Sequence, residues 1–195
     1  MRKSDRRMTM KGDSRVKTGT TAPSRVGQIG MVVRDASRAA EHFSRIYAIE
    51  PWYRAEFVEK ETFYRGARIE LDAEILIGFC GGIEVELIQM NNDVENIYSD
   101  ILGKQDGGIH HMGFFISGYD DKVAAMKAKG VEPLQWGTLR TKGGAVTRYT
   151  YFDTIGTCGT VTEYIETKFL GLNIPHSHFM VRFSTLTGDV KRVRL

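Results

Sequence analysis

The sequence predicts an α+β fold made of two tandem β-α-β-β-β modules, and three observations lead to this prediction. In each half of the chain, apolar runs of strand length accompany one amphipathic helical segment. The order of these elements starts again near the middle of the chain. A repeat of this length is too long for a solenoid unit and fits a duplicated module. Landmark residues keep similar offsets, which are 83 positions from Gln28 to His111, 82 from Pro51 to Pro133 and 77 from Glu86 to Glu163.

The composition is ordinary for a globular protein of one domain or two small fused ones. The chain has 195 residues, of which 42% are hydrophobic and 26% charged, with a net charge of +3. Residues 1–25 are basic and lack apolar periodicity, so we expect a disordered leader rather than a nucleic-acid-binding arm or a transit peptide. No run suits a signal core or a membrane span, and two cysteines are too few for a disulfide framework. We therefore expect a cytoplasmic protein without nucleic-acid or membrane partners.

The first module is expected over residues 26–90. Residues 26–33 form an apolar run of strand length, and Asp35 is placed to cap the amphipathic helix that follows and that ends before Pro51. Residues 57–63 read as a strand or loop and residues 69–79 contain a further apolar strand. After a Gly-Gly turn, residues 83–89 alternate with period two, as a half-buried strand does.

The second module is expected over residues 107–168, after a polar linker at 91–106. It repeats the strand, helix and strands of the first module, with a hairpin turn at Gly143 and Gly144. Residues 169–195 form a C-terminal extension, in which 179–185 and 190–195 are predicted to pair as a hairpin. This extension could add an edge strand, cover a cleft or serve a dimer interface.

Duplication suggests that equivalent polar residues face a shared centre. The equivalent pairs are Gln28 with His111 and Glu86 with Glu163, and each lies in an otherwise apolar strand. A buried carboxylate needs a partner, and one divalent cation could bind all four side chains. This ligand set suits Zn, Ni, Co, Mn or Mg. The ordinary alternatives are a core histidine and the solvent side of an amphipathic strand.

Two neighbouring residues complicate the choice of ligands. Glu84 also lies on the strand of Glu86, but it matches Val161 in the repeat, so we expect Glu86 to be the acid that points inward. His111, not His110, aligns with Gln28. We therefore expect His110 to face the other side of its strand.

These residues resemble the vicinal oxygen chelate superfamily, most of all its glyoxalase I and methylmalonyl-CoA epimerase branch. The resemblance covers residues 26–167 and rests on four stretches: VGQIGMVVRD (26–35), GIHHMGF (108–114), ELIQ (86–89) and EYIE (163–166). It implies eight strands in two βαβββ modules around an open, barrel-like cleft. It also implies metal ligands at Gln28, Glu86, His111 and Glu163, with Glu163 as the first candidate base and Glu86 as the second.

The implied activity is that of a metal-dependent lyase, isomerase or epimerase acting on a small-molecule substrate, and we expect a homodimer. In this branch a divalent ion holds neighbouring oxygens of the substrate while a proton moves next to the carbonyl or enediolate. One alternative is a non-catalytic protein that sequesters an apolar compound. Another is an Fe(II) dioxygenase, which Gln28 disfavours because that branch has a histidine there. We find no arginine set for glutathione and no signature for coenzyme A.

Other side chains are weaker candidates for the site. His176 and His178 would share a face if their segment were a strand, as a second metal pair. Six aromatic residues could line the cleft or pack in the core, and three arginines could bind an anion or lie in solvent. The aromatic residues are Trp52, Tyr53, Phe57, Trp136, Tyr149 and Tyr151, and the arginines are Arg65, Arg140 and Arg148.

Overall fold

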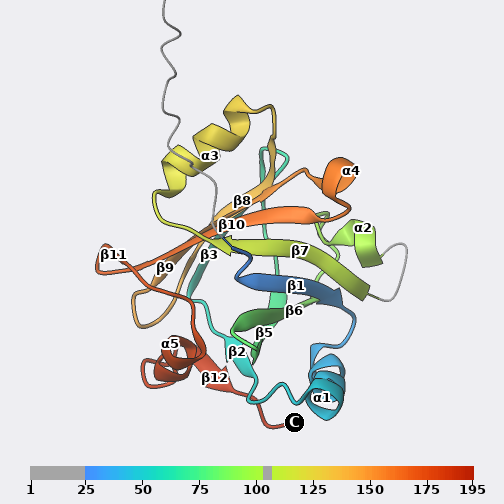
Figure 1. The fold of residues 1–195 in the computed structure, drawn as a ribbon, viewed down its shortest axis with the longest axis vertical. Helices are drawn as coiled ribbons and strands as arrows, with labels where there is room; N and C mark the ends of the chain where they lie inside the picture. Colours follow the sequence, from blue (N-terminus) through green and yellow to red (C-terminus); the bar gives the residue numbers. More distant parts are fainter. Residues whose placement is uncertain (1–24, 103–106) are drawn as a thin grey trace, which may run out of the picture.

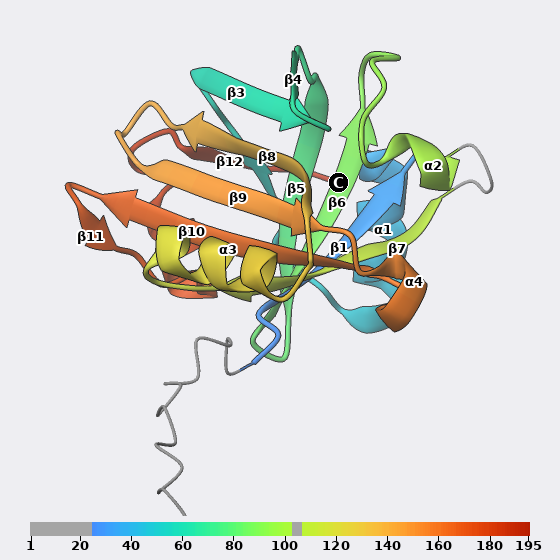
Figure 2. The same ribbon diagram turned by 90° about the horizontal axis from the view of Figure 1, so that it is seen from above.

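The strands of the chain form one mixed sheet that is curled into an open half-barrel (Figures 1 and 2). The computed structural model describes residues 25–102 and 107–195. The predicted leader at 1–25, apart from its last residue, and part of the predicted linker lie outside the described residues. The α+β fold predicted from the sequence is confirmed.

The first half of the sheet has the order β2-β5-β6-β1, with β1 and β6 parallel. Helix α1 packs on the outer side of this half, against β5 and β6 (Figure 1). The elements are β1 (Gln28–Val33), α1 (Ala36–Tyr47), β2 (Tyr53–Ala55), β5 (Ala73–Cys80) and β6 (Ile83–Met90).

The second half repeats this arrangement in the order β7-β10-β9-β8, with β7 and β10 parallel. Helix α3 lies against β10, as Figure 2 shows. A turn containing Gly143 and Gly144 joins β8 to β9, as predicted. The elements are β7 (Gly107–Phe115), α3 (Tyr119–Ala128), β8 (Pro133–Arg140), β9 (Val146–Phe152) and β10 (Val161–Phe169).

Strands β1 and β7 pair antiparallel at the centre and join the two halves. Gly30 of β1 lies opposite Glu86 of β6, and Gly113 of β7 lies opposite Glu163 of β10. The two halves are therefore related position by position at the seam. This register agrees with the equivalence of Glu86 and Glu163 read from the sequence.

An additional hairpin, β3 (Glu59–Tyr64) and β4 (Ala67–Ile69), leaves the first half and pairs with β8 of the second. The backbones approach closely at Gly137, where an added Cβ would lie 2.2 Å from the carbonyl oxygen of Glu61. The hairpin therefore extends the sheet beyond β8 with a segment from the other half. The sequence indicated a strand near 57–63 but not this crossing.

Helix α1 begins at the cap that the sequence singled out and ends before Pro51, as predicted. The Asp35 carboxylate accepts a hydrogen bond from the backbone N–H of Arg38 at 2.8 Å, which confirms the predicted cap. Ala48 adopts a left-handed conformation at the other end, with φ of 54°. Beneath the helix, Ile49 and Trp52 are buried in a core with Leu76 and Leu87 of the sheet.

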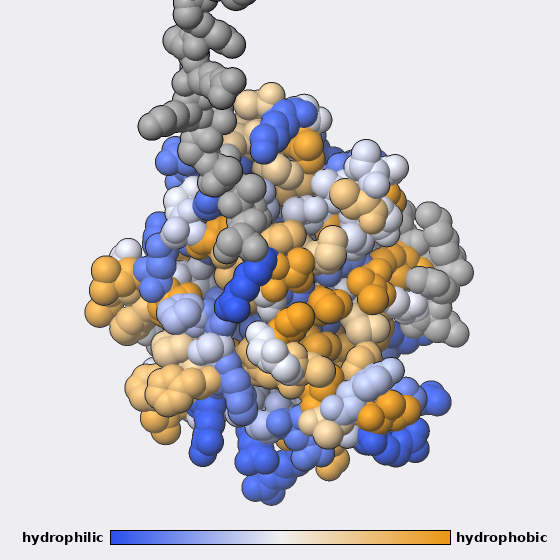
Figure 3. Space-filling view, in the orientation of Figure 1, coloured by the Kyte–Doolittle hydropathy of each residue, from blue (hydrophilic) through white to orange (hydrophobic). Residues whose placement is uncertain are grey.

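The C-terminal extension differs from the hairpin predicted for it. The segment predicted as its first strand forms α5 (His178–Phe183), while β12 (Val190–Arg192) pairs with β2 as an edge strand. Ser177 caps α5 by accepting from the N–H of Met180, so the segment turns into a helix that buries Val181. Phe179 and Phe183 remain exposed, and Figure 3 shows the apolar surface over α5.

Three short elements complete the fold, and none of the helices described is long and apolar enough to cross a membrane. Helix α2 lies in the predicted linker and contacts β1 and β7. These elements are α2 (Ser99–Leu102), α4 (Ile155–Cys158) and β11 (Leu172–Asn173).

Candidate metal centre

The four residues proposed as metal ligands from the sequence lie together at the seam between the two halves. His111 is fully buried, and its Nε2 atom lies 3.1 Å from Glu163 Oε2 and 3.4 Å from Glu86 Oε2. The same nitrogen lies 3.2 Å from Gln28 Oε1. One imidazole nitrogen is thus surrounded by three oxygens that come from both halves of the chain.

Two glycines at equivalent positions make room for this arrangement. A Cβ added at Gly30 would lie 1.8 Å from the His111 ring, and one added at Gly113 would lie 2.5 Å from Gln28 Oε1. On the paired strands β1 and β7, Gly30 lies opposite His111 and Gly113 lies opposite Gln28. Their missing side chains allow Gln28 and His111 to approach the shared centre.

His110 does not face away from the site, contrary to the expectation from strand alternation. Gly30 pairs with His111 and Met31 pairs with Ile109, so His110 is the extra residue of a β-bulge. The bulge breaks the alternation and places the His110 ring beside that of His111, with Nδ1 to Nδ1 at 3.0 Å.

This bulge fixes which nitrogen of His111 faces the centre. His110 Nε2 lies 3.3 Å from the carbonyl oxygen of Ile97, which can only accept, so the nitrogen must donate. Burial and the neighbouring His111 lower the pKa of His110 to about 3, so the ring is neutral and its Nδ1 accepts. His111 therefore donates from Nδ1, and its Nε2 faces the three oxygens. Such a hydrogen bond on the second nitrogen is typical of metal-binding histidines.

The donor atoms fit a divalent cation better than they fit one another. A single N–H at His111 Nε2 can satisfy one of three acceptors, and the buried Glu163 Oε2 has no hydrogen-bond partner. Tetrahedral ligands about 2.0–2.2 Å from zinc lie roughly 3.4 Å from one another, close to the distances from His111 Nε2 to the three oxygens. The ligand atoms of Glu86, His111 and Glu163 all lie within 4.8 Å of one another. Without a cation, burial lowers the pKa of His111 but Glu163 and Glu86 outweigh it and raise it to about 9. The positive charge that this cluster favours could come from a proton or a metal ion.

Glu84 is a buried acid that the repeat comparison set aside. It lies two residues from Glu86 on the same strand, so both side chains project from one face. Its carboxylate accepts from Gln28 Nε2 at 2.8 Å and lies 3.4 Å from His176 Nδ1. Glu84 thus orients the Gln28 amide with its oxygen toward His111. The expectation that Glu86 alone points inward is wrong, and the shared parity of the two positions could have shown it.

Three tyrosines shield the cluster. Tyr98 and Tyr151 form ring-edge contacts with His110, and the Tyr98 hydroxyl donates to that of Tyr151 at 2.9 Å. Tyr149 contacts Thr62 through its hydroxyl, also at 2.9 Å. Burial raises the pKa of all three phenols, so they remain neutral. Tyr98 comes from the predicted linker and was not foreseen as part of the site.

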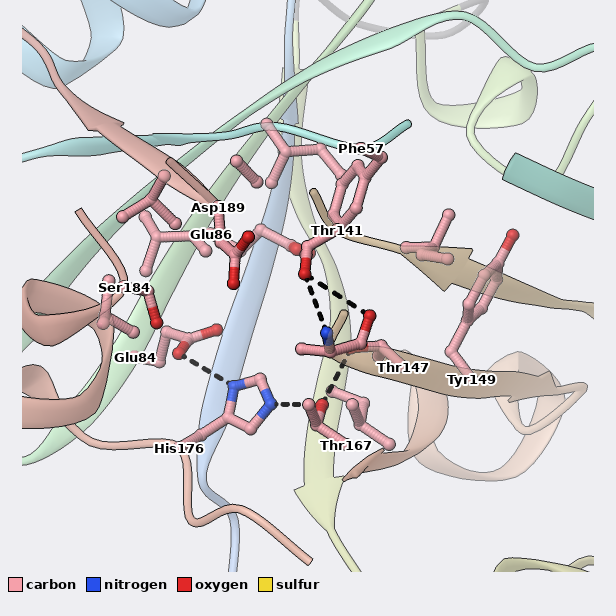
Figure 4. A pocket seen from close by; sticks show the side chains of 18 of the residues that line it. Phe57, Glu84, Glu86, Thr141, Thr147, Tyr149, Thr167, His176, Ser184 and Asp189 are labelled. Carbon is pink, nitrogen blue, oxygen red and sulfur yellow. Dashed lines mark hydrogen bonds and ion pairs between the residues drawn. The ribbon is translucent and has the colours of Figure 1, made fainter. Parts of the chain in front are cut away.

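The cluster opens into a cavity of about 260 Å³ between the two halves and the C-terminal extension. Gln28, Glu86 and Glu163 line one end of it, and Figure 4 shows Glu84, Glu86 and His176 around the same space. The strand pair proposed for His176 and His178 is wrong. Because Ser177 caps α5, His176 lies in the cavity wall whereas the His178 ring lies near Tyr53 and Phe79.

The other candidates from the sequence divide between the cavity and the rest of the fold. Phe57, Tyr149 and Tyr151 line the cavity, while Trp52 and Tyr53 are buried in separate clusters of the core. Trp136 stacks on Phe63. None of the three candidate arginines lines the cavity: Arg65 lies over Tyr64, Arg140 pairs with Glu59 and Arg148 pairs with Asp120.

Residues 27–151 match a family model described as the Glyoxalase/Bleomycin resistance protein/Dioxygenase superfamily. A search of curated proteins gives no match.

Solved structures with a similar fold include two methylmalonyl-CoA epimerases. The one from Mycobacterium tuberculosis has a TM-score of 0.53 at 15% identity, and the match covers 78% of this chain and 94% of that one. The second is a Streptomyces coelicolor variant in complex with 2-nitronate-propionyl-CoA. Its TM-score is 0.53 at 18% identity, with 79% and 100% covered. A hypothetical protein from Bacillus halodurans has a TM-score of 0.53 at 14% identity, with 76% and 98% covered. At such identities the likeness shows a shared fold.

Proposed function

We propose, from the premise that this chain belongs to the glyoxalase/bleomycin resistance protein/dioxygenase superfamily, that it is a metal-dependent lyase or isomerase. The reaction would move a proton next to a carbonyl group of a small molecule. The observation that carries the proposal is the set of three oxygens within 3.4 Å of one buried imidazole nitrogen. Epimerases share the fold, so an epimerisation is compatible with it.

Gln28, Glu86, His111 and Glu163 would hold the cation. Once bound, a divalent cation would polarise the substrate carbonyl as a Lewis acid. His110 would keep the lone pair of His111 Nε2 aimed at the site, and Glu84 would keep the oxygen of Gln28 turned the same way.

The carboxylates next to the cavity would move the proton. We assign Glu163 as the base that takes the proton from the carbon next to the carbonyl, while the electrons of that C–H bond move into the carbonyl group. Glu86 lines the same end of the cavity and is the second candidate to take or return a proton. Return to the same carbon from the other face gives an epimer, and return to a neighbouring atom gives an isomer.

The first experiment is metal analysis of protein purified without chelator and then loaded with zinc, nickel, cobalt, manganese or magnesium. We expect about one equivalent of one divalent ion per chain.

The second experiment is a screen for solvent-deuterium exchange into 2-oxo compounds and acyl thioesters. Glu163→Gln should abolish exchange and keep the native circular dichroism spectrum. The control Glu70→Gln changes an exposed carboxylate and should exchange normally.

A non-catalytic binding protein of the same fold is the alternative, because most of the cavity lining is apolar. That protein would bind small molecules equally well with and without the metal ion. The binding protein would be favoured over the enzyme if the chain bound none of the ions tested. In that case chelator should also leave the affinity for small molecules unchanged. An iron dioxygenase would consume oxygen with Fe(II), and the single histidine among the four clustered ligands disfavours it.

A further inference from the structure

The cavity next to the metal cluster is lined mainly by aliphatic side chains. Its aliphatic wall on the sheet comes from β5, β6, β8 and β10 and from the loop before β5. The aliphatic residues on this side are Leu71, Ile75, Ile77, Ile88, Leu139 and Ile165. Burial of a hydrocarbon group against such a wall is favourable by the area it removes from water. The cavity volume of about 260 Å³ lies below the roughly 300–1,000 Å³ of most ligand pockets, which indicates a compact ligand.

The charges in the lining disfavour an anionic ligand away from the metal. Among the described lining residues Lys60 is the one lysine or arginine, and it lies 3.6 Å from Asp72. Four carboxylates line the same cavity, and they belong to Glu84, Glu86, Glu163 and Asp189. Nothing in this lining resembles the cluster of cations that binds a phosphate or a nucleotide.

The polar residues beyond the metal end are already bonded to the protein. His176 Nε2 lies 2.7 Å from the Thr167 hydroxyl, which in turn lies 2.8 Å from that of Thr147 (Figure 4). The other ring nitrogen of His176 faces Glu84, and its ring stacks on Phe115 at 4.0 Å. These groups can form the wall of the cavity without needing a hydrogen bond from a ligand.

The C-terminal extension forms one side of this space and is anchored to both halves of the sheet. Ile174, Met180 and Val181 line the cavity from this segment. The Asp189 carboxylate accepts a hydrogen bond from the backbone N–H of Gly143, in the β8–β9 turn, at 2.6 Å. The backbone carbonyl of Asp189 accepts from the backbone N–H of Glu56, just after β2. The extension is therefore a built wall of the site.

We propose that the substrate is a compact molecule whose carbonyl end is followed by an uncharged hydrocarbon tail. The carbonyl end would bind at the metal cluster, and the tail would lie between the sheet and α5. This inference rests on the proposed function, because it takes the metal cluster as the site of the carbonyl group. It excludes a nucleotide or phosphate group enclosed within the cavity.

The test uses straight-chain alkyl hydroxamates from acetohydroxamate to octanohydroxamate, whose two oxygens chelate zinc. Binding to the zinc-loaded full chain is measured by calorimetry after a zinc titration. We expect the affinity to rise about fourfold for each added methylene group until the cavity is filled. A hydroxamate of matched length whose tail ends in a phosphate should bind at least about tenfold more weakly than its alkyl counterpart, because the tail would bury a charge.

The outcomes separate the inference from the proposed function. If zinc does not bind, or if hydroxamates bind equally with and without zinc, the proposed function fails and takes the inference with it. If zinc-dependent binding is independent of tail length, or if the phosphate tail binds more tightly, the inference alone is overturned.

Two neighbouring positions on α5 give a matched pair of variants. Met180 lines the cavity, whereas Phe179 is 73% exposed on the outer side of the helix. Met180→Trp should lower the affinity for octanohydroxamate by at least about tenfold and leave that for acetohydroxamate unchanged, since overfilling affects the tail. Phe179→Trp should change neither. Met180→Gln, which keeps the length of the side chain, should reduce the gain for each methylene if the tryptophan variant does not fold. Equal effects of the two tryptophan variants would contradict the position assigned to the tail.

Discussion

At the scale of single residues, the site depends on two missing side chains. Gly30 lies directly against the His111 ring, and Gly113 lies against the Gln28 amide. Neither glycine offers a ligand atom, and in the sequence both are ordinary members of a repeated apolar strand. Their equivalence follows from the register, in which each stands opposite one of the two paired glutamates. The duplication thus repeats the glycines that make room for the ligands as well as the ligands themselves.

Gly30→Ala should therefore weaken metal binding. Its Cβ would lie 1.8 Å from the His111 ring, which must move and take Nε2 away from Gln28, Glu86 and Glu163. We expect the zinc affinity to fall by about 10- to 100-fold, as for other changes that displace a ligand indirectly. Competition with a chromophoric chelator measures this affinity. The control is Gly156→Ala, where an added Cβ meets no atom within 4 Å, and it should leave the affinity unchanged. Equal affinities of the two variants would refute the role given to Gly30.

At the scale of elements, α1 shows how local sequence signals define a helix. Asp35→Ala removes the carboxylate that accepts from the N–H of Arg38, and we expect the free energy of unfolding to fall by about 1 kcal/mol. Asp35→Asn keeps an accepting oxygen and should lower the free energy of unfolding by at most a few tenths of a kcal/mol. Urea denaturation with unchanged m-values measures the difference. The cap would be irrelevant if both variants unfolded at the same midpoint.

Signals of this local kind explain which parts of the structure could be predicted. The alternation at 83–89 and the matching landmarks gave the strands and their duplication, because strand periodicity and chain order are properties of the sequence itself. The bulge at His110 depends on the pairing partner, so alternation alone misplaced its side chain. Helix α5 was missed because a segment of six residues has weak periodicity, and burial of Val181 decides its form.

The pairing of β3 with β8 lies beyond local signals for a different reason. It joins segments from the two halves, and it depends on the curvature that brings the free edge of β8 to the hairpin. The candidate ligands could be named because duplication relates them by position. Three other residues reach the cavity: Tyr98 from the linker, His176 from the C-terminal extension and Glu84 from the strand of Glu86. Tyr98 and His176 lie outside the duplicated modules, and Glu84 has no acidic counterpart in the second module.

At the scale of the whole molecule, the proposed metal ion would connect the two halves of the chain. Gln28 and Glu86 come from the first half, and His111 and Glu163 come from the second. A ligand that binds the folded state alone stabilises it by about 4 kcal/mol at 1,000 times its dissociation constant, which corresponds to roughly 10 °C in a protein of this size. We therefore expect zinc to raise the unfolding midpoint in a single transition.

The same linkage predicts where protection appears. Amide hydrogen exchange should slow in β1 and β6 as well as in β7 and β10, because loss of either half releases the ion. Chelator should reverse the effect, and Glu163→Gln should reduce it strongly. His42→Asn, which changes an exposed histidine of α1, should keep the full response and so exclude binding to surface histidines. Protection confined to β7 and β10 would mean that the ion is held by the second half alone, and that Gln28 and Glu86 are not ligands.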